Sequence, residues 1–197
     1  MNKISGKSGR IKIGSVISIT AATAAGGVVT VTAANTLSVG MFILISGVLG
    51  MVDLNNNGKG HLVTAASATD FEVALTTTQT YTSGGTAQRI LPITDWNLNV
   101  SAEVAEALDS ESGEWKERLI GKFKDWDGDY AALDYDGANM YPVGEELAVE
   151  LDEDDANYYS GSAIFDNFKT GVKVAGAAAI TVSGTFKGNG ELAKTHS

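Results

Sequence analysis

Large apolar residues recur at every second position in the second half of the chain. Three runs show this spacing: Trp96, Leu98 and Val100; Leu147, Val149 and Leu151; and Ile180, Val182 and Phe186. Successive side chains of a β-strand point to opposite faces, so the spacing predicts strands with one buried face and one solvated face. Such strands are typical of antiparallel sheets.

The first half contains shorter apolar runs between clusters of turn-forming residues. The predicted strands are Val28–Ala33, Met41–Ser46, His61–Ala65, Phe71–Leu75 and Thr86–Ile90. The predicted turns are Gly26-Gly27, Ser38-Val39-Gly40, Asn55-Asn56-Asn57-Gly58 and Ser83-Gly84-Gly85. Short strands at this spacing predict a small β-barrel or β-sandwich.

One segment has helical spacing instead. Within Ser112–Ile120, the apolar residues Trp115, Leu119 and Ile120 fall on one helical face, with Glu114 in the first turn. Gly121 follows as a C-terminal stop. The sequence therefore predicts an all-β protein with one short helix.

Composition changes near Ile90 and predicts two folding units. Residues 16–89 are rich in Ala, Thr, Val and Gly and nearly free of charge, whereas most carboxylates follow Asp95. We therefore predict an inserted small β-domain over residues 16–89, within a larger domain formed by residues 1–15 and 90–197.

The net charge of −10 disfavours non-specific binding to nucleic acid. The longest apolar run, Val39–Val52, is shorter than the roughly 20 residues of a membrane span, so no membrane contact is expected.

The sequence offers little for catalysis or for binding of metals and cofactors. There is no cysteine, and a Ser-His-Asp site would depend on His61 because His196 lies at the C-terminus. Two stretches have the spacing of calcium ligands: Asp53, Asn55, Asn57 and Gly58; and Asp125, Asp127 and Asp129. The first has Thr64 where a bidentate Glu is required, and the second has Tyr130 where a sharp turn requires Gly. On a strand, the second set would line one face. We predict a non-enzymatic protein without metal or cofactor.

When the low-charge stretch is left out, Ile4–Gly14 is followed by Ile93-Thr-Asp-Trp-Asn-Leu-Asn-Val100. This joined sequence resembles phage tail tube proteins, which have a short N-terminal strand before a Trp-x-Leu-x-Val strand. The residues that carry the resemblance are Trp96, Leu98, Val100, Gly113, Trp115, Gly121, Trp126 and Gly128. Glu114 separates Gly113 from Trp115, where the family often has Gly-Trp. Residues 16–89 resemble a small β-module of phage structural proteins, in segments such as Ser38–Met51 and Tyr81–Ala87.

The resemblance implies an antiparallel β-sandwich or barrel with one helix. It also implies a virion protein of the tail, assembled in the bacterial cytoplasm, whose hexameric rings stack and conduct DNA into the host. The expected partners are other copies of the chain, with tape measure, tail terminator and baseplate or tip proteins at the tube ends, and DNA that passes without specific binding.

An acidic lumen wall would repel passing DNA. The candidate lumen or loop acids are Asp125, Asp127, Asp129, Glu150, Asp152, Glu153, Asp154 and Asp155, with Glu145 and Glu146 as further acids nearby. The alternative hypothesis is a carbohydrate- or surface-binding β-sandwich. In that case Trp96, Trp115, Tyr158 and Tyr159 would form an exposed aromatic platform.

Overall fold

The computed structural model describes residues 2–6, 8–107, 117–134, 143–154, 157–171 and 180–195. Its strands are all antiparallel to their neighbours and form one large sheet. They are β1 (Asn2–Gly6), β2 (Ser8–Ser18), β3 (Ala21–Ala25), β4 (Val28–Thr32), β5 (Phe42–Leu49), β6 (His61–Ala66), β7 (Asp70–Ala74), β8 (Ser83–Ala107), β9 (Glu117–Asp134), β10 (Glu146–Asp152), β11 (Tyr158–Thr170) and β12 (Ile180–Thr195). A short 3₁₀ helix, η1, covers Val52–Gly58. The predicted all-β class with one short helix is confirmed.

Six strands close into a ring, which we call the first barrel. Its order is β2-β10-β11-β12-β9-β8, and β8 pairs back onto β2. The side chains that point inward form one apolar cluster that includes Ile11, Trp96, Trp126, Val149 and Phe186. The alternating residues of the second half are therefore buried as predicted, except Leu147, which is partly buried, and Val100, which is exposed.

The second apolar cluster lies within another ring, the second barrel. Its order is β8-β5-β6-β7-β4-β3. The chain at the end of β2 closes this ring, because the Ile19 amide donates to Gly85 of β8 and the Thr20 amide donates to Thr32 of β4. The inward residues include Val29, Val31, Ile43, Phe71 and Val73.

Four predicted strands of the second barrel, those that became β4, β5, β6 and β7, are confirmed to within a few residues. The fifth, Thr86–Ile90, is part of the much longer β8. Gly26 and Gly27 form the predicted two-residue turn between β3 and β4, with φ of 62° and 84°. Both positive φ values fit the turn type that matches strand twist. The predicted turn at Ser83-Gly84-Gly85 is wrong, because β8 begins at Ser83 and pairs there with Leu49.

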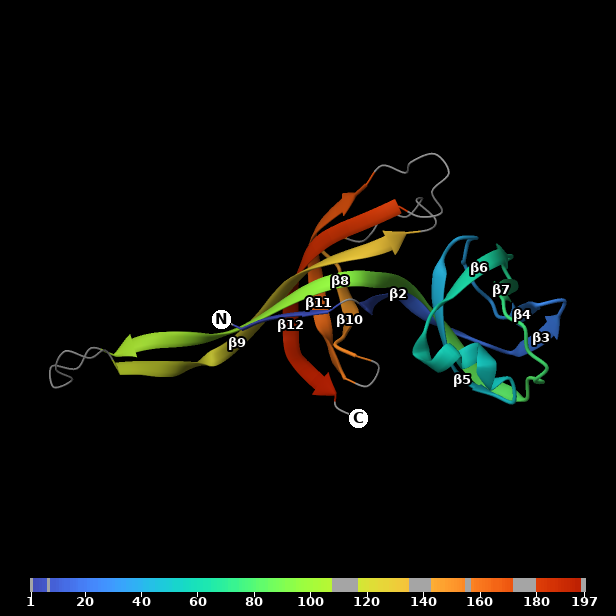
Figure 1. Cartoon of the computed structure of the whole chain (residues 1–197), viewed down its shortest axis with the longest axis horizontal. Helices are drawn as coiled ribbons and strands as arrows, with labels where there is room; N and C mark the ends of the chain where they lie inside the picture. Colours follow the sequence, from blue (N-terminus) through green and yellow to red (C-terminus); the bar gives the residue numbers. More distant parts are fainter. Residues whose placement is uncertain are drawn as a thin grey trace.

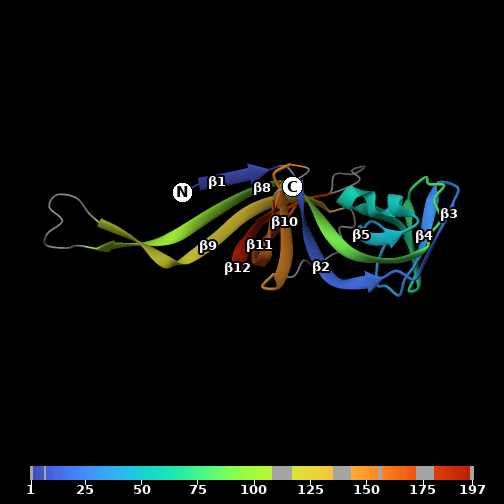
Figure 2. The same cartoon turned by 90° about the horizontal axis from the view of Figure 1, so that it is seen from below.

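β2 and β8 belong to both barrels (Figures 1 and 2). They pair with each other from Gly9↔Ile93 to Ser18↔Thr86, with a bulge between Ile13 and Ile17. The first cluster gives way to the second between Ile11 of β2 and Ile19, which directly follows β2, and between Leu91 and Ala87 on β8. The boundaries predicted from composition thus fall inside continuous strands rather than in linkers.

The predicted helix at Ser112–Ile120 is wrong for the residues that the structure describes. Glu117–Ile120 belongs to β9 and pairs with Ala107–Val104 of β8, and Gly121 lies within the same strand. Ser112–Lys116 lies outside the described residues. Pairing along a long hairpin satisfies these backbone groups, which overrides a weak local helical preference.

The short helix instead occupies the stretch that was predicted as an Asn/Gly turn. Asn56 and Asn57 have φ of 43° and 48°, in the left-handed region that Asn tolerates better than most residues. The Asn55 side chain accepts a bond from the Val48 amide (3.0 Å) and donates one to the Val48 carbonyl (3.1 Å). These two bonds hold η1 against β5.

β8 and β9 extend beyond the first barrel as a two-stranded ribbon. It runs from the pair Ser101↔Asp125 to the pair Ala107↔Glu117. β1 pairs with β8 only as far as Val100, and β12 pairs with β9 only as far as Asp127. Figure 1 shows the ribbon at the opposite end of the molecule from the second barrel.

Candidate functional surface

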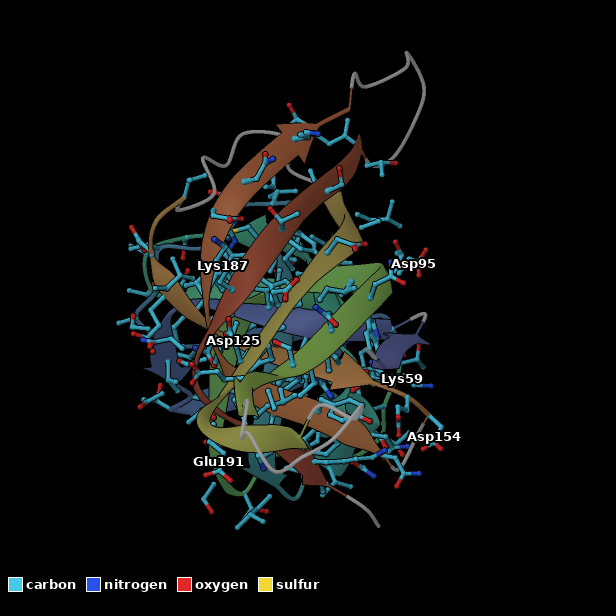
Figure 3. All side chains as sticks on the ribbon, turned by 90° about the vertical axis from the view of Figure 1, so that its left-hand side faces the viewer. Lys59, Asp95, Asp125, Asp154, Lys187 and Glu191 are labelled. Carbon is cyan, nitrogen blue, oxygen red and sulfur yellow. The ribbon has the colours of Figure 1, made fainter. Side chains whose placement is uncertain are left out.

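Three carboxylates lie at alternate positions of β9, on its outer face. Asp125, Asp127 and Asp129 alternate with Trp126 and Tyr130, which are buried in the first barrel, and with Gly128. The structure therefore places these acids on one face of a strand. We call this set the β9 acid row. Figure 3 looks onto this side of the molecule and shows β12, β9 and β8 next to one another, with Asp125 and Asp95 among the labelled acids.

Amide side chains on β8 hold two members of the row. Asn97 donates to Asp129 (2.7 Å), and Asn99 donates to Asp127 (3.1 Å). Each pair consists of directly opposed residues of the two strands. In the described part of the chain, none of the three acids forms an ion pair with Lys or Arg. Among the described residues, no cation therefore compensates the β9 acid row.

Two other candidate acids are compensated by cations. Glu150 forms ion pairs with Arg10 (Nε to Oε2, 2.6 Å) and with Lys12. Asp152 also pairs with Arg10 (Nη2 to Oδ1, 3.8 Å). Arg10 also donates to the carbonyl of Gly58 at the end of η1. This network connects β2 and β10 of the first barrel to the second barrel. It contributes no net negative field of the kind that repels DNA.

Glu153 and Asp154 are engaged in the turn that precedes β11. Glu153 accepts bonds from Lys194 (2.8 Å) and from the Tyr159 hydroxyl (2.9 Å), and the bond from Lys194 is the main reason why the pKa of Glu153 is lowered. The same contact raises the pKa of Lys194. Asp154 accepts bonds from the Asn157 amide (2.7 Å) and side chain. Asp155 lies outside the described residues.

The aromatic residues of the alternative hypothesis do not form a platform. Trp96 is fully buried, donates to the Ser8 carbonyl (2.7 Å) and packs edge-on against the buried Tyr159 ring at 6.2 Å. Tyr158 is only partly exposed. Trp115 and Gly113 lie outside the described residues. The exposure of Trp96 and Tyr159 that the alternative hypothesis requires is therefore contradicted, because both rings are part of the first core.

Trp126, Leu98 and Gly128 are core residues as well. Trp126 donates to the Gly190 carbonyl (3.0 Å), and its ring lies directly over Gly161 and Gly188, where a side chain would collide with it. Leu98 is fully buried. A Cβ at Gly128 would collide with the Phe186 ring. Of the residues that carry the family resemblance, Trp96, Leu98, Trp126 and Gly128 thus serve packing, whereas Val100 is exposed.

The described residues hold little that could catalyse a reaction. His61 is buried, its Nε2 bonds the Leu54 carbonyl at 2.8 Å, and desolvation lowers its pKa. Burial raises the pKa of Tyr130 to about 12, so this phenol stays protonated at neutral pH. Within the described ranges, no three His, Asp or Glu side chains come close enough to share a metal ion.

The side chains of the first calcium-like stretch, at Asp53 and Asn55, form hydrogen bonds with neighbouring residues. Asp53 accepts a bond from the Thr77 hydroxyl (2.6 Å), and Asn55 is bonded to Val48. These oxygens therefore do not converge on one point.

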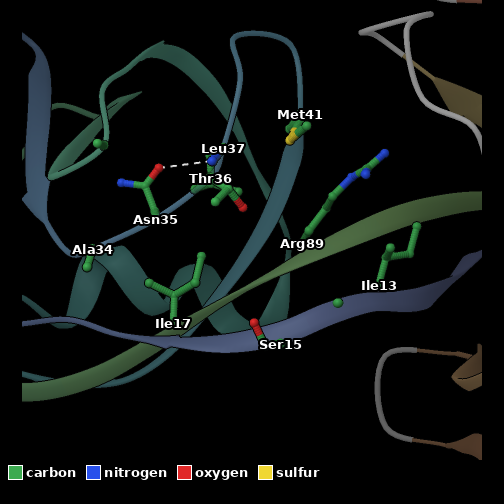
Figure 4. A pocket seen from close by; sticks show the side chains of 11 residues that line it. Ile13, Ser15, Ile17, Ala34, Asn35, Thr36, Leu37, Met41 and Arg89 are labelled. Carbon is green, nitrogen blue, oxygen red and sulfur yellow. Dashed lines mark hydrogen bonds between the residues drawn. The ribbon is translucent and has the colours of Figure 1, made fainter.

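Sequence reasoning missed the cations that decide these environments. Arg10 and Lys12 lie 140 and 138 positions before Glu150, so no local pattern could pair them. It also missed Arg89, which lines a cavity of about 480 Å³ between the barrels (Figure 4).

Comparison with protein-family models gave no match, and comparison with curated proteins gave none either. Among the helices of the described chain, none has the length and apolar character that crossing a membrane requires.

Proposed function

We propose that this chain is the repeating structural subunit of a bacteriophage tail tube, with hexameric rings that stack and conduct DNA. The role requires no catalysis, metal or cofactor. The proposal combines the sequence resemblance with one structural observation, the ribbon of β8 and β9 that projects beyond the first barrel.

The ribbon supports self-assembly because its edges are unpaired. From Ser101 to Ala107 on β8, and over the facing part of β9, the described strands provide no third neighbour. An isolated two-stranded ribbon is marginally stable in water, and open strand edges readily accept another strand. Contacts with neighbouring copies would cover these edges. A head-to-tail arrangement of such contacts closes into a ring when its rotation divides the circle.

The β9 acid row supports the assignment of the lumen. Its carboxylates are uncompensated and lie on β9 next to the ribbon. Cations on a channel wall would hold phosphates, whereas carboxylates repel them. Of the acids that the sequence offered, we therefore assign Asp125, Asp127 and Asp129 to the wall. Glu150, Asp152, Glu153 and Asp154 act within the subunit.

Electron microscopy of the purified full chain at high concentration tests assembly. We expect rings and short tubes. The matched variant replaces residues 103–123 by Asn-Gly, which closes β8 onto β9 directly after the pair Ala102↔Lys124. This variant should keep the first barrel folded and lose the rings. Rings that persist without the ribbon would contradict its role, and a full chain that stays monomeric would contradict the proposed function.

Charge reversal tests the lumen. Changing Asp125, Asp127 and Asp129 to Lys should leave assembly intact and make DNA adhere, with a salt slope steeper by about 0.9 per phosphate contact. The control reverses Glu145 and Glu146, which are exposed at the start of β10. Equal DNA retention in both variants would refute the assignment of the β9 acid row.

A further inference from the structure

A cavity of about 480 Å³ lies where β2 and β8 pass from the first barrel to the second. Its walls are mostly apolar, with Ile13 and Ile17 on β2, and Leu37 and Met41 from the segment that leads into β5. Among the described residues that line it, Arg89 of β8 is the only charged one. Figure 4 shows Arg89 rising from β8 between Ile13 and Met41.

The Arg89 guanidinium has no partner in the described part of the chain. Its side chain forms no hydrogen bond or ion pair with a described residue, although it is partly buried, and the described residues of the lining include no acid. Arg10 provides the contrast, since its guanidinium is bonded to Glu150 and to the Gly58 carbonyl. Because Arg89 is only partly buried, its N–H donors remain accessible to an added acceptor.

Local backbone features shape the cavity. Between the pairs Ile13↔Arg89 and Ile17↔Ala87, β2 carries extra residues and bulges away from β8. Gly14 takes a φ of 70° in this bulge, and its carbonyl accepts a bond from Gln88. Bulges are frequent beside functional sites, where they change the direction of a side chain.

Hydrogen bonds also fix the loop that forms the wall opposite β2 and β8. Asn35 donates to the Ala33 carbonyl (2.8 Å) and accepts a bond from the Leu37 amide (3.0 Å), which fixes the loop over the cavity (Figure 4). The Asn35 amide is therefore used within the loop. Arg89 remains as the charged group that a ligand can reach.

We propose that the Arg89 cavity binds a carboxylate that is attached to an apolar chain. Arg matches a carboxylate with two parallel N–H donors, and the apolar walls would cover the attached carbons. Two sources share this chemistry: a free organic acid, and an Asp or Glu side chain of a second copy. The inference does not depend on the proposed tail function.

The first experiment titrates the full chain with hexanoate and follows backbone amide signals near the cavity by NMR. We expect saturable shifts at Gly14, Leu37 and Arg89. Hexanamide, which lacks the charge, and acetate, which lacks the apolar chain, should each bind more weakly. Arg89→Gln should weaken hexanoate binding by about tenfold to a hundredfold, as expected for a lost charged hydrogen bond. Arg89→Lys should retain part of the affinity.

Sedimentation equilibrium of the same proteins distinguishes the two sources. If a second copy supplies the carboxylate, Arg89→Gln weakens self-association and hexanoate competes with it. If a free acid is the ligand, hexanoate binds and self-association does not change. Hexanoate binding that is equal in the parent chain and in both folded variants would overturn the proposal, as would the absence of binding at millimolar concentration together with self-association that is independent of Arg89.

Discussion

The two apolar clusters predict that the second barrel can unfold while the first barrel remains folded. Phe71 is fully buried at the centre of the second cluster, on β7 between β4 and β6. Phe71→Ala should cost about 3–5 kcal/mol, the usual range for a buried Phe. A unit the size of residues 16–89 has a free energy of unfolding of roughly 4–11 kcal/mol, from typical values per residue. The substitution should therefore remove a large part of the stability of the second barrel.

Tryptophan fluorescence separates the two barrels in a urea titration. The three tryptophans lie at positions 96, 115 and 126 of the sequence, outside residues 16–89, and the two that the structure describes are in the first cluster. Hydrogen exchange of the β4 and β7 amides reports on the second barrel. In Phe71→Ala, protection of those amides should be lost at lower urea than the change in fluorescence.

Phe186→Ala is the matched control. Phe186 is buried in the first cluster, against Trp126 at a ring distance of 6.0 Å. Here the fluorescence midpoint should fall. The two barrels share β2 and β8, and Arg10 bonds to Gly58, so some coupling is expected. Coincident fluorescence and exchange transitions in Phe71→Ala would refute independent unfolding and show that the shared strands make one cooperative unit.

Three further predictions concern single buried groups. Burial lowers the pKa of His61 below its usual 6.5. As the pH falls, His61 is therefore protonated in the unfolded chain before it is protonated in the folded chain, so stability should fall as pH drops below 6.5. His61→Gln should flatten that decline in urea titrations of the second barrel, and an unchanged slope would contradict the assignment. Gly188→Ala places a Cβ against the Trp126 ring. The overpacking should lower the free energy of unfolding by about 1–3 kcal/mol, seen as a lower urea midpoint of the fluorescence transition. A neutral effect would mean that the ring can shift. Trp96→Phe leaves the Ser8 carbonyl without its donor and should cost about 1–3 kcal/mol in thermal unfolding. No loss of stability there would show that water replaces the indole.

The sequence by itself determined which face of several strands is buried. Alternation at Leu147, Val149 and Leu151 identified a half-buried strand, because a strand has a period of two wherever it lies in the sheet. The same reasoning placed the β9 acids on one face. The Gly26-Gly27 turn was equally local, since positive φ at both positions is a property of the residues themselves.

Only the tertiary structure decided how the strands close and which charges remain free. Helical spacing at Leu119 and Ile120 was outweighed by pairing with β8. Trp96 is buried rather than part of an exposed platform, because it donates to Ser8 and packs against Tyr159. Glu150 and Asp127 look alike in sequence, yet Arg10 compensates the first and not the second. The physical reason is distance along the chain. The ion pairs, the closure of the barrels and the place of Arg89 in the cavity lining all depend on segments that the fold brings together. Local periodicity carries no information about such contacts.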